Sequence, residues 1–123
     1  MSDKLSVAII GCGRVASKHL KAIKKLNKMC ELKALVDVSE EAPARLLLSS
    51  KLDPSGVEIF SDYKAMIDQV KPDIVAVTVP SGLHYAIAAY AMEHGCNLLL
   101  EKPMTMSTGE SRKMAELSEK TGR

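Results

Sequence analysis

The sequence predicts an α/β fold in which helices cover both faces of one doubly wound parallel sheet. Short apolar runs rich in β-branched residues alternate strictly with longer segments of helical periodicity, without repeats or low-complexity linkers. The run at residues 74–79 is continuous, which is typical of a strand buried on both faces. With 123 residues, 46% of them hydrophobic, the chain is long enough for one domain and too short for two. We therefore expect a single domain over residues 1–123.

The predicted elements follow one another in the order strand, helix, strand. The strands are expected at residues 5–10, 31–37, 57–60, 74–79 and 97–100. The helices are expected at residues 14–28, 39–50, 63–70, 81–94 and 107–122. Polar residues and glycines mark their ends: Ser39, Ser61 with Asp62, Ser81, Gly95, and a capping box from Ser107 to Glu110. The expected strand order is 3-2-1-4-5, with a crevice at the carboxyl ends of strands 1 and 4, where such sheets bind ligands.

A glycine turn lies where the first strand gives way to the first helix. Its sequence is Gly11-Cys12-Gly13-Arg14-Val15-Ala16. Gly11 makes the tight turn, and Gly13 has no Cβ, so that backbone N–H groups can approach a pyrophosphate at the helix N-terminus. Ala16 takes the position of the third glycine, where the helix packs on the strand. The pattern predicts a dinucleotide-binding (Rossmann) unit, with Gly11, Cys12, Gly13, Arg14 and Val15 along the cofactor.

An acidic residue ends the second predicted strand. Asp37 lies 21 residues past Ala16, at the distance where a carboxylate accepts hydrogen bonds from the ribose hydroxyls. A carboxylate repels a 2′-phosphate, and the next residue, Val38, offers no positive charge. NAD is therefore the predicted cofactor in preference to NADP.

At these residues the chain resembles the Gfo/Idh/MocA family, the glucose-fructose oxidoreductase, inositol dehydrogenase and rhizopine-catabolism oxidoreductases. The resemblance rests on residues 7–16, on residues 79–84 and on the Glu101-Lys102-Pro103 triplet, and it covers essentially the whole chain. It implies hydride transfer between a nicotinamide cofactor and a hydroxyl of a sugar, a cyclitol or a related substrate. By resemblance, Lys102 is the catalytic residue, and Glu101 helps to orient it.

The resemblance also places loop residues beside the cofactor. These are Pro80, Ser81 and His84, with His84 lining the site without a catalytic role. The loop and the residues around Lys102 are similar to the subgroup acting on nucleotide-linked N-acetylhexosaminuronic acids. Family members are usually near three times this length, with a second domain that supplies substrate-holding residues and oligomer contacts. We thus expect this chain to be the cofactor half of an enzyme, lacking the C-terminal substrate domain, whose longer parent is a homo-oligomer.

Composition excludes several other classes of partner. The net charge is only +2, and the lysines of the first helix lie opposite its apolar stripe (Ala16, Leu20, Ile23 and Leu26), so nucleic acid binding is not expected. No apolar run is long enough to span a membrane, and the polar N-terminus does not form a signal peptide. Three cysteines without metal-ligand spacing indicate buried thiols in a reducing compartment, so we expect a cytoplasmic protein without a metal site.

Two other function classes share part of the pattern. Dinucleotide-sensing regulatory domains carry the same glycine turn but do not need the Glu101-Lys102-Pro103 triplet. Methyltransferases that use adenosylmethionine also combine a glycine turn with an acid after the second strand, but the spacing of the turn and Lys102 favour the oxidoreductase. Substitution of Lys102 by Ala in a full-length parent distinguishes the sensor domain from the oxidoreductase, because an intact activity or biological response would favour the sensor.

Overall fold

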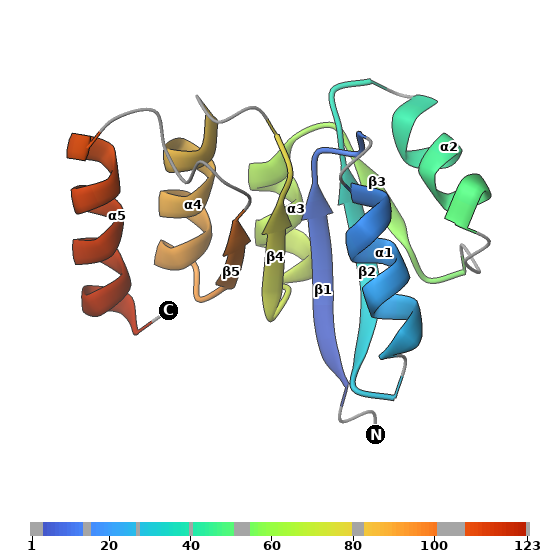
Figure 1. The fold of residues 1–123 in the computed structure, drawn as a ribbon, viewed down its shortest axis with the longest axis horizontal. Helices are drawn as coiled ribbons and strands as arrows, with labels where there is room; N and C mark the ends of the chain where they lie inside the picture. The colour runs from blue at the N-terminus through green and yellow to red at the C-terminus, as the bar shows by residue number, and fades with distance from the viewer. Residues whose placement is uncertain are drawn as a thin grey trace.

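The computed structural model describes residues 4–13, 16–26, 28–39, 41–50, 55–79, 83–100 and 108–122. Five parallel strands form one sheet in the order β3-β2-β1-β4-β5, as the sequence predicted (Figure 1). The strands are β1 (Leu5–Ile10), β2 (Cys30–Val36), β3 (Glu58–Phe60), β4 (Ile74–Val77) and β5 (Asn97–Leu100). The helices are α1 (Ala16–Lys25), α2 (Glu41–Ser50), α3 (Tyr63–Val70), α4 (His84–Glu93) and α5 (Thr108–Thr121).

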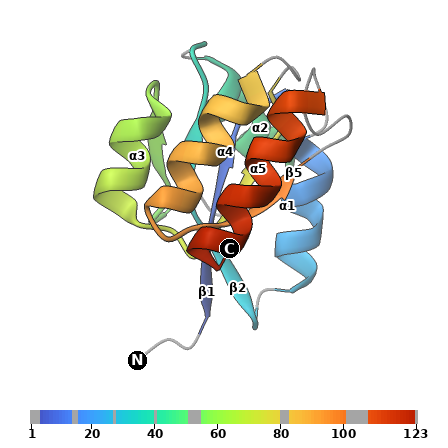
Figure 2. The same cartoon turned by 90° about the vertical axis from the view of Figure 1, so that its left-hand side faces the viewer.

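The helices form a layer on each face of the sheet. One layer holds α1 and α2, and the other holds α3 and α4, with α5 beside α4 (Figures 1 and 2). Alternate residues of each strand therefore enter different cores, which explains why β4 is apolar at every position. Along β1, Val7 and Ile9 pack toward α1 and α2, while Ala8 and Ile10 pack toward α3 and α4.

Several element boundaries differ from the predicted ones, among them the ends of α1 and β4. Helix α1 ends at Lys25 instead of Lys28, because Met29 and Cys30 already donate their backbone N–H groups to the carbonyl of Leu26 in a turn, at 2.8 and 3.0 Å. As a result Leu26, predicted to be buried, is 48% exposed. Strand β4 ends at Val77 instead of Val79, although the backbone N–H of Thr78 still donates to Ile10.

The predicted helix caps were partly right. Asp62 is the N-cap of α3, and its carboxylate accepts the backbone N–H of Lys64 at 3.1 Å. Helix α2 begins at Glu41, so Ser39 lies outside its capping position, and its backbone N–H donates to Asp37 instead. Leu83 occupies the N-cap position of α4, which makes the prediction of Ser81 as its cap wrong. Ser81 itself and the Ser107 end of the predicted capping box lie outside the described residues.

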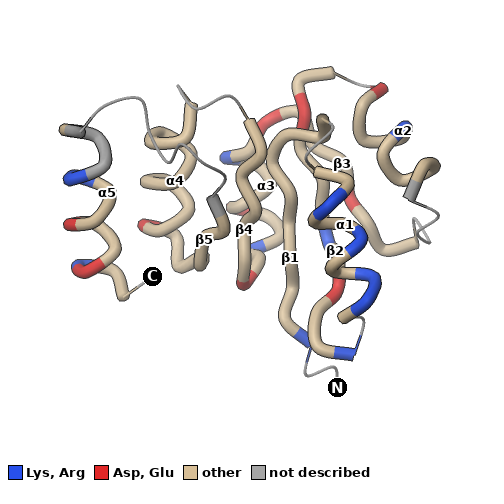
Figure 3. Tube along the Cα trace, viewed as in Figure 1, with Lys and Arg blue, Asp and Glu red and all other residues tan. Residues whose placement is uncertain are grey.

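The lysines of α1 lie on its exposed face, as predicted. Lys18, Lys21, Lys24 and Lys25 are all exposed, whereas Ala16, Leu20 and Ile23 are buried against the sheet and α2. The blue segments along α1 in Figure 3 mark its basic residues. Lysine side chains at these positions keep their charges in water and contribute little to the core. The structure thus supports a solvated face for this helix.

Helix α5 packs mainly on α4. Met114 and Leu117 join Ala88 and Met92 of α4 in a separate apolar cluster. Leu98 of β5 joins this cluster, while its neighbour Leu99 is 49% exposed. Helix α5 thus covers the side of α4 that faces away from α3.

The burial of α1 predicts where the stability of this fold resides. Leu20 is 0% exposed, so Leu20→Ala removes packed atoms and leaves a cavity, with an expected loss of about 2–5 kcal/mol in the free energy of unfolding. Leu48 of α2 is 82% exposed, so Leu48→Ala is the matched control and is expected to change that free energy by less than about 0.5 kcal/mol. Urea unfolding of both variants measures the difference, and equal losses would contradict this assignment of the core.

Candidate functional site

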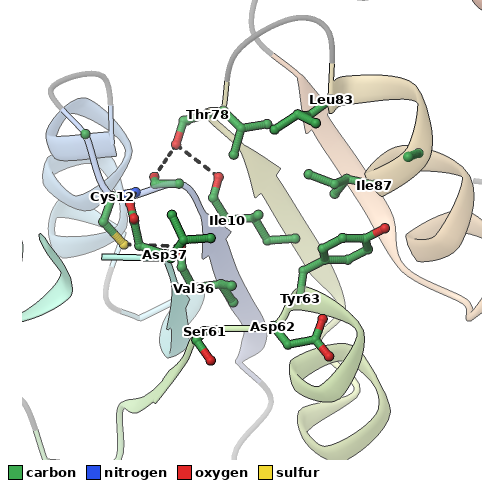
Figure 4. Close-up of a pocket in the computed structure, with 15 residues that line it drawn as sticks. Ile10, Cys12, Val36, Asp37, Ser61, Asp62, Tyr63, Thr78, Leu83 and Ile87 are labelled. Atoms are coloured by element: carbon green, nitrogen blue, oxygen red, sulfur yellow. Dashed lines mark hydrogen bonds between the residues drawn. The ribbon is translucent and has the colours of Figure 1, made fainter. Parts of the chain in front are cut away.

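A cavity of about 590 Å³ opens at the carboxyl ends of β1, β2 and β4 (Figure 4). This is the place where the strand order reverses and where open α/β sheets bind their ligands. Its volume is within the usual range for small-molecule and cofactor sites. The described residues that line it come from the glycine turn, the ends of β2, β3 and β4, and the first turns of α3 and α4: Ile10, Gly11, Cys12, Gly13, Val36, Asp37, Val38, Ser61, Asp62, Tyr63, Thr78, Val79, Leu83, Ala86 and Ile87.

Gly11 is required by the backbone conformation of the turn. Its φ of +97° is in the region that glycine tolerates and L side chains rarely adopt. A Cβ at this position would lie 2.8 Å from the carbonyl oxygen of Thr78 and 2.9 Å from a methyl group of Val79. The Thr78 hydroxyl donates in turn to the carbonyls of Ile10 and Gly11, so the ends of β1 and β4 are tied together at this point.

Gly13 differs from Gly11, because the space around it is open. Apart from Gly13 itself and its two chain neighbours, no described atom lies within 4 Å of a Cβ built on Gly13, and the residue is exposed. Its carbonyl accepts the backbone N–H of Ala16 at 3.1 Å, which begins the first turn of α1. Gly11 is therefore needed for the fold, while Gly13 leaves room for a group from outside the chain, such as a phosphate, to approach the backbone.

The carboxylate of Asp37 connects the glycine turn to the end of β2. One oxygen, Oδ2, accepts the backbone N–H of Cys12 at 2.8 Å (Figure 4). The other, Oδ1, accepts the N–H of Ser39 at 2.9 Å. A carboxylate has about four lone-pair positions, so two backbone donors leave acceptor capacity for two hydroxyl groups. Asp37 thus positions the turn and can also bind a ribose diol.

The thiol of Cys12 is held in an unreactive form. Its side chain is 6% exposed, and its Sγ donates to the carbonyl of Val36 at 3.6 Å. Burial, followed by the charge of Asp37, raises the pKa of this thiol from 9.0 to about 12. Cys12 therefore contributes its backbone N–H to the site, and its thiolate is not available near neutral pH.

An apolar wall completes the cavity on the side of α3 and α4. The backbone N–H of Asp37 donates to the carbonyl of Phe60 at 3.1 Å, which brings the end of β3 beside the end of β2. The chain then enters α3 at Tyr63, whose ring faces Leu83 and Ile87 across the cavity (Figure 4). The sequence patterns did not indicate these three residues as site residues. Their one signal is position, since each lies in the first turn of a helix that follows a strand or directly before such a turn.

His84 lies behind this wall and is not among the described residues that line the cavity. It is 1% exposed, and its Nε2 is 2.9 Å from the carbonyl oxygen of Val79. Because a carbonyl only accepts hydrogen bonds, Nε2 carries the proton in this contact. His84 thus holds the backbone at Val79, which itself lines the cavity.

The structure brings together the predicted Gly11, Cys12, Gly13, Asp37 and Val38 at one cavity. Five further predicted site residues and the predicted catalytic residue lie outside the described part of the chain: Arg14, Val15, Pro80, Ser81, Glu101 and Lys102. Their roles stay predictions.

A parallel strand, a glycine turn at positive φ and a carboxylate bound to that turn define the chain as a dinucleotide-binding Rossmann domain. A family model described as "Oxidoreductase family, NAD-binding Rossmann fold" matches residues 5–123. The chain belongs to this family, Gfo/Idh/MocA, and the predicted cofactor NAD is the one that the family description names.

Named relatives are longer than this chain. D-glucoside 3-dehydrogenase of Escherichia coli (strain K12) is 35% identical over 122 residues, which are 99% of this chain and 34% of that protein. Inositol 2-dehydrogenase of Corynebacterium glutamicum (strain R) is 28% identical over 98% of this chain and 34% of its own length. A crystal structure of the WlbA dehydrogenase from Bordetella pertussis, in complex with NADH and UDP-GlcNAcA, aligns with a TM-score of 0.87 and 27% identity, over 97% of this chain and 34% of that one. The chain thus spans about a third of the length of these relatives.

No helix in the described part of the chain is long and apolar enough to cross a membrane.

Alanine substitutions at the two glycines of the turn are expected to affect different properties, stability at Gly11 and dinucleotide binding at Gly13. Gly11→Ala forces a Cβ into the Thr78 carbonyl and is expected to lower the free energy of unfolding by about 1–3 kcal/mol. Gly13→Ala meets open space and is expected to leave that free energy nearly unchanged while weakening dinucleotide binding. Thermal unfolding and NADH titration of both variants check this contrast, which a large loss of stability in Gly13→Ala would refute.

The raised pKa of Cys12 predicts slow alkylation. At pH 8 a thiol with a pKa of about 12 is almost wholly protonated, so iodoacetamide is expected to modify Cys12 far more slowly than the half-buried Cys30. Peptide mass mapping at timed intervals measures both rates in one sample. Equal rates for the two cysteines would show that the thiol is not protected as described.

Proposed function

We propose that this chain is the cofactor half of an oxidoreductase and binds NAD(H) in the 590 Å³ cavity. The observation that carries the proposal is the geometry of Asp37, whose carboxylate accepts the Cys12 N–H at 2.8 Å. The backbone of Gly13, the next residue, has open space beside it. A diphosphate over the turn and a ribose diol on Asp37 would satisfy both features at once.

The apolar wall suits the adenine ring of the same cofactor. Tyr63, Leu83 and Ile87 offer a flat ring and two aliphatic groups beyond Asp37, where a base attached to the ribose would lie. When bound, the nicotinamide accepts or donates the hydride. The described residues bind and orient the cofactor, and none of them is assigned a proton transfer.

The proposed substrate is a hydroxyl of a sugar, a cyclitol or a nucleotide sugar. The names of the relatives support this range, since they include a glucoside dehydrogenase, an inositol dehydrogenase and an enzyme crystallised with UDP-GlcNAcA. The nucleotide-linked N-acetylhexosaminuronic acid class predicted from the loop residues is a member of this range. Lys102 is the proposed catalytic residue, because a lysine with a lowered pKa can accept the hydroxyl proton and an ammonium can stabilise the emerging oxygen.

Two further proposals concern the context of the chain. A longer protein that carries this domain is proposed to be a homo-oligomer, with substrate-holding residues from a second domain. A cytoplasmic location is supported by Cys12, Cys30 and Cys96, which carry thiols and form no disulfide, as expected in a reducing compartment.

Cofactor choice tests the role of Asp37. We expect the chain to bind NADH more tightly than NADPH, because the carboxylate accepts from the 2′-hydroxyl and repels a 2′-phosphate. Asp37→Ser removes a charge-assisted acceptor, so it is expected to weaken NADH binding by about tenfold or more. The same variant is expected to show a smaller preference for NADH over NADPH. Isothermal titration with both cofactors measures the two ratios. Tighter binding of NADPH to the unaltered chain would overturn the assignment.

The proposal also predicts what the isolated chain does not do. Because substrate-holding residues are assigned to another domain, the 123-residue chain is expected to bind NADH weakly and to show no turnover of glucosides, inositols or UDP-sugars. Absorbance at the nicotinamide band monitors turnover. Hydride transfer by the isolated chain would refute the assignment of the substrate-holding residues to another domain. Full activity after Lys102→Ala in a longer parent would favour a sensor domain.

A further inference from the structure

A second cavity, of about 330 Å³, lies between the first turn of α1 and helix α2. Its described lining includes Ser17 of α1, Arg45 and Ser49 of α2, and Cys12 and Gly13 of the glycine turn, and we call it the α1–α2 cavity. Cys12 and Gly13 also line the cofactor cavity. The two cavities therefore meet at the backbone of the glycine turn.

The two cavities carry opposite charges. Among the described residues that line the cofactor cavity, the charged side chains are Asp37 and Asp62, and both are carboxylates. In the described lining of the α1–α2 cavity the charged side chain is Arg45, and Ser17 and Ser49 add hydroxyl groups. A guanidinium is suited to a phosphate group, which it binds through parallel N–H donors. A phosphate is therefore favoured in the α1–α2 cavity and disfavoured beside the two carboxylates.

Arg45 has N–H donors to offer in this cavity. The Ser49 hydroxyl already donates to the carbonyl of Leu46 at 3.1 Å, so the guanidinium is the stronger source of donors. Nη2 of Arg45 donates to Oε2 of Glu41 at 3.2 Å, one helical turn away, and a guanidinium has five N–H groups in all. The two side chains are 72% and 85% exposed, and exposed ion pairs are weak. A phosphate with two negative charges can therefore compete with Glu41 for Arg45.

The ribose site brings a cofactor to the boundary between the two cavities. Asp37 binds the ribose diol in the proposed complex, and its Oδ2 accepts the backbone N–H of Cys12 at 2.8 Å. Cys12 is one of the two residues that the cavities share. Gly13, the other, has open space where a Cβ would lie, so no side chain separates the cavities at this residue. A group on the ribose 2′-oxygen can therefore extend past Gly13 into the α1–α2 cavity.

We infer that the α1–α2 cavity is a subsite for the 2′-phosphate of NADP(H), with Arg45 as the residue that determines how well this second cofactor binds. Asp37 repels the 2′-phosphate, and Arg45 offsets part of this repulsion by binding the same group. The chain is therefore expected to bind NADPH more weakly than NADH, but measurably. The inference rests on the proposed function, since it needs the ribose on Asp37.

The test is isothermal titration with NADH and NADPH at one pH and one salt concentration, because salt screens exposed charges. Arg45→Gln removes the positive charge and is expected to weaken NADPH binding about three- to tenfold, since an exposed charge-assisted contact is lost. NADH carries no 2′-phosphate, so its affinity is expected to change by less than about twofold. The same loss of NADPH affinity is expected when Arg45→Gln is combined with Asp37→Ser.

Glu41→Gln is expected to act in the opposite direction. It removes both the acceptor that engages Arg45 and a negative charge near the phosphate, so NADPH is expected to bind about two- to threefold more tightly while NADH affinity stays the same. Arg112→Gln on α5 is the matched control, because Arg112 is an exposed arginine outside the described lining of both cavities. It is expected to change neither affinity.

Inorganic phosphate distinguishes a dinucleotide from a free anion as the ligand of this cavity. Phosphate bound beside Arg45 is expected to compete with NADPH more strongly than with NADH. If Arg45→Gln weakens the binding of inorganic phosphate but leaves NADPH affinity unchanged, the cavity takes a free anion and the inference is wrong.

The outcomes also separate this inference from the proposed function. Equal losses of NADH and NADPH affinity in Arg45→Gln would overturn the inference, because Arg45 would then act on a feature common to both cofactors. Undetectable NADPH binding under conditions where NADH binds would overturn it as well. Absence of binding by both cofactors would instead contradict the proposed function, and the inference with it.

Discussion

The hydrogen bond from the Cys12 N–H to the carboxylate of Asp37 is the interaction on which the site depends. It joins residues 25 positions apart in the sequence and ties the glycine turn after β1 to the end of β2. It holds the turn beside the carboxylate that we propose to bind the ribose, and Cys12 and Asp37 both line the cavity. The carboxylate that accepts the hydrogen bond from the turn also has acceptor capacity left for two hydroxyl groups. One side chain can therefore stabilise the turn and bind a ligand.

The second constraint is the close approach of β1 and β4 at Gly11 and Thr78. A side chain at Gly11 has no room, and the Thr78 hydroxyl bonds the carbonyls of the turn. This approach ends β4 two residues earlier than the apolar run suggests, so that Thr78 and Val79 line the cavity. The end of a strand is set here by packing across the sheet, which β-propensity does not report.

Much of the fold followed from local patterns in the sequence. The exposed lysines of α1 and the Asp62 cap depend on periodicity and capping chemistry that a few neighbouring residues specify, and the strand order follows from the strict alternation of strands and helices. The predicted ends of α1 and β4 were wrong: a local turn at Leu26 follows α1, and β4 ends at Val77 beside the close approach of Gly11 and Thr78. For the site, the turn and Asp37 were predictable from their spacing. Tyr63, Leu83 and Ile87 were not, because their role arises from where α3 and α4 lie relative to β2. His84 was assigned to the site surface, yet it is buried behind Val79.

The central claim is that a dinucleotide lies over the glycine turn with its ribose on Asp37. The most direct measurement is a nuclear magnetic resonance titration of the ¹⁵N-labelled chain with NADH, following the backbone amide signals. The largest shifts are predicted for Cys12, Gly13 and Val38, with smaller shifts at Tyr63 and Ile87 on the apolar wall. Saturable shifts confined to other surfaces, such as the exposed face of α1 or helix α5, would contradict the account.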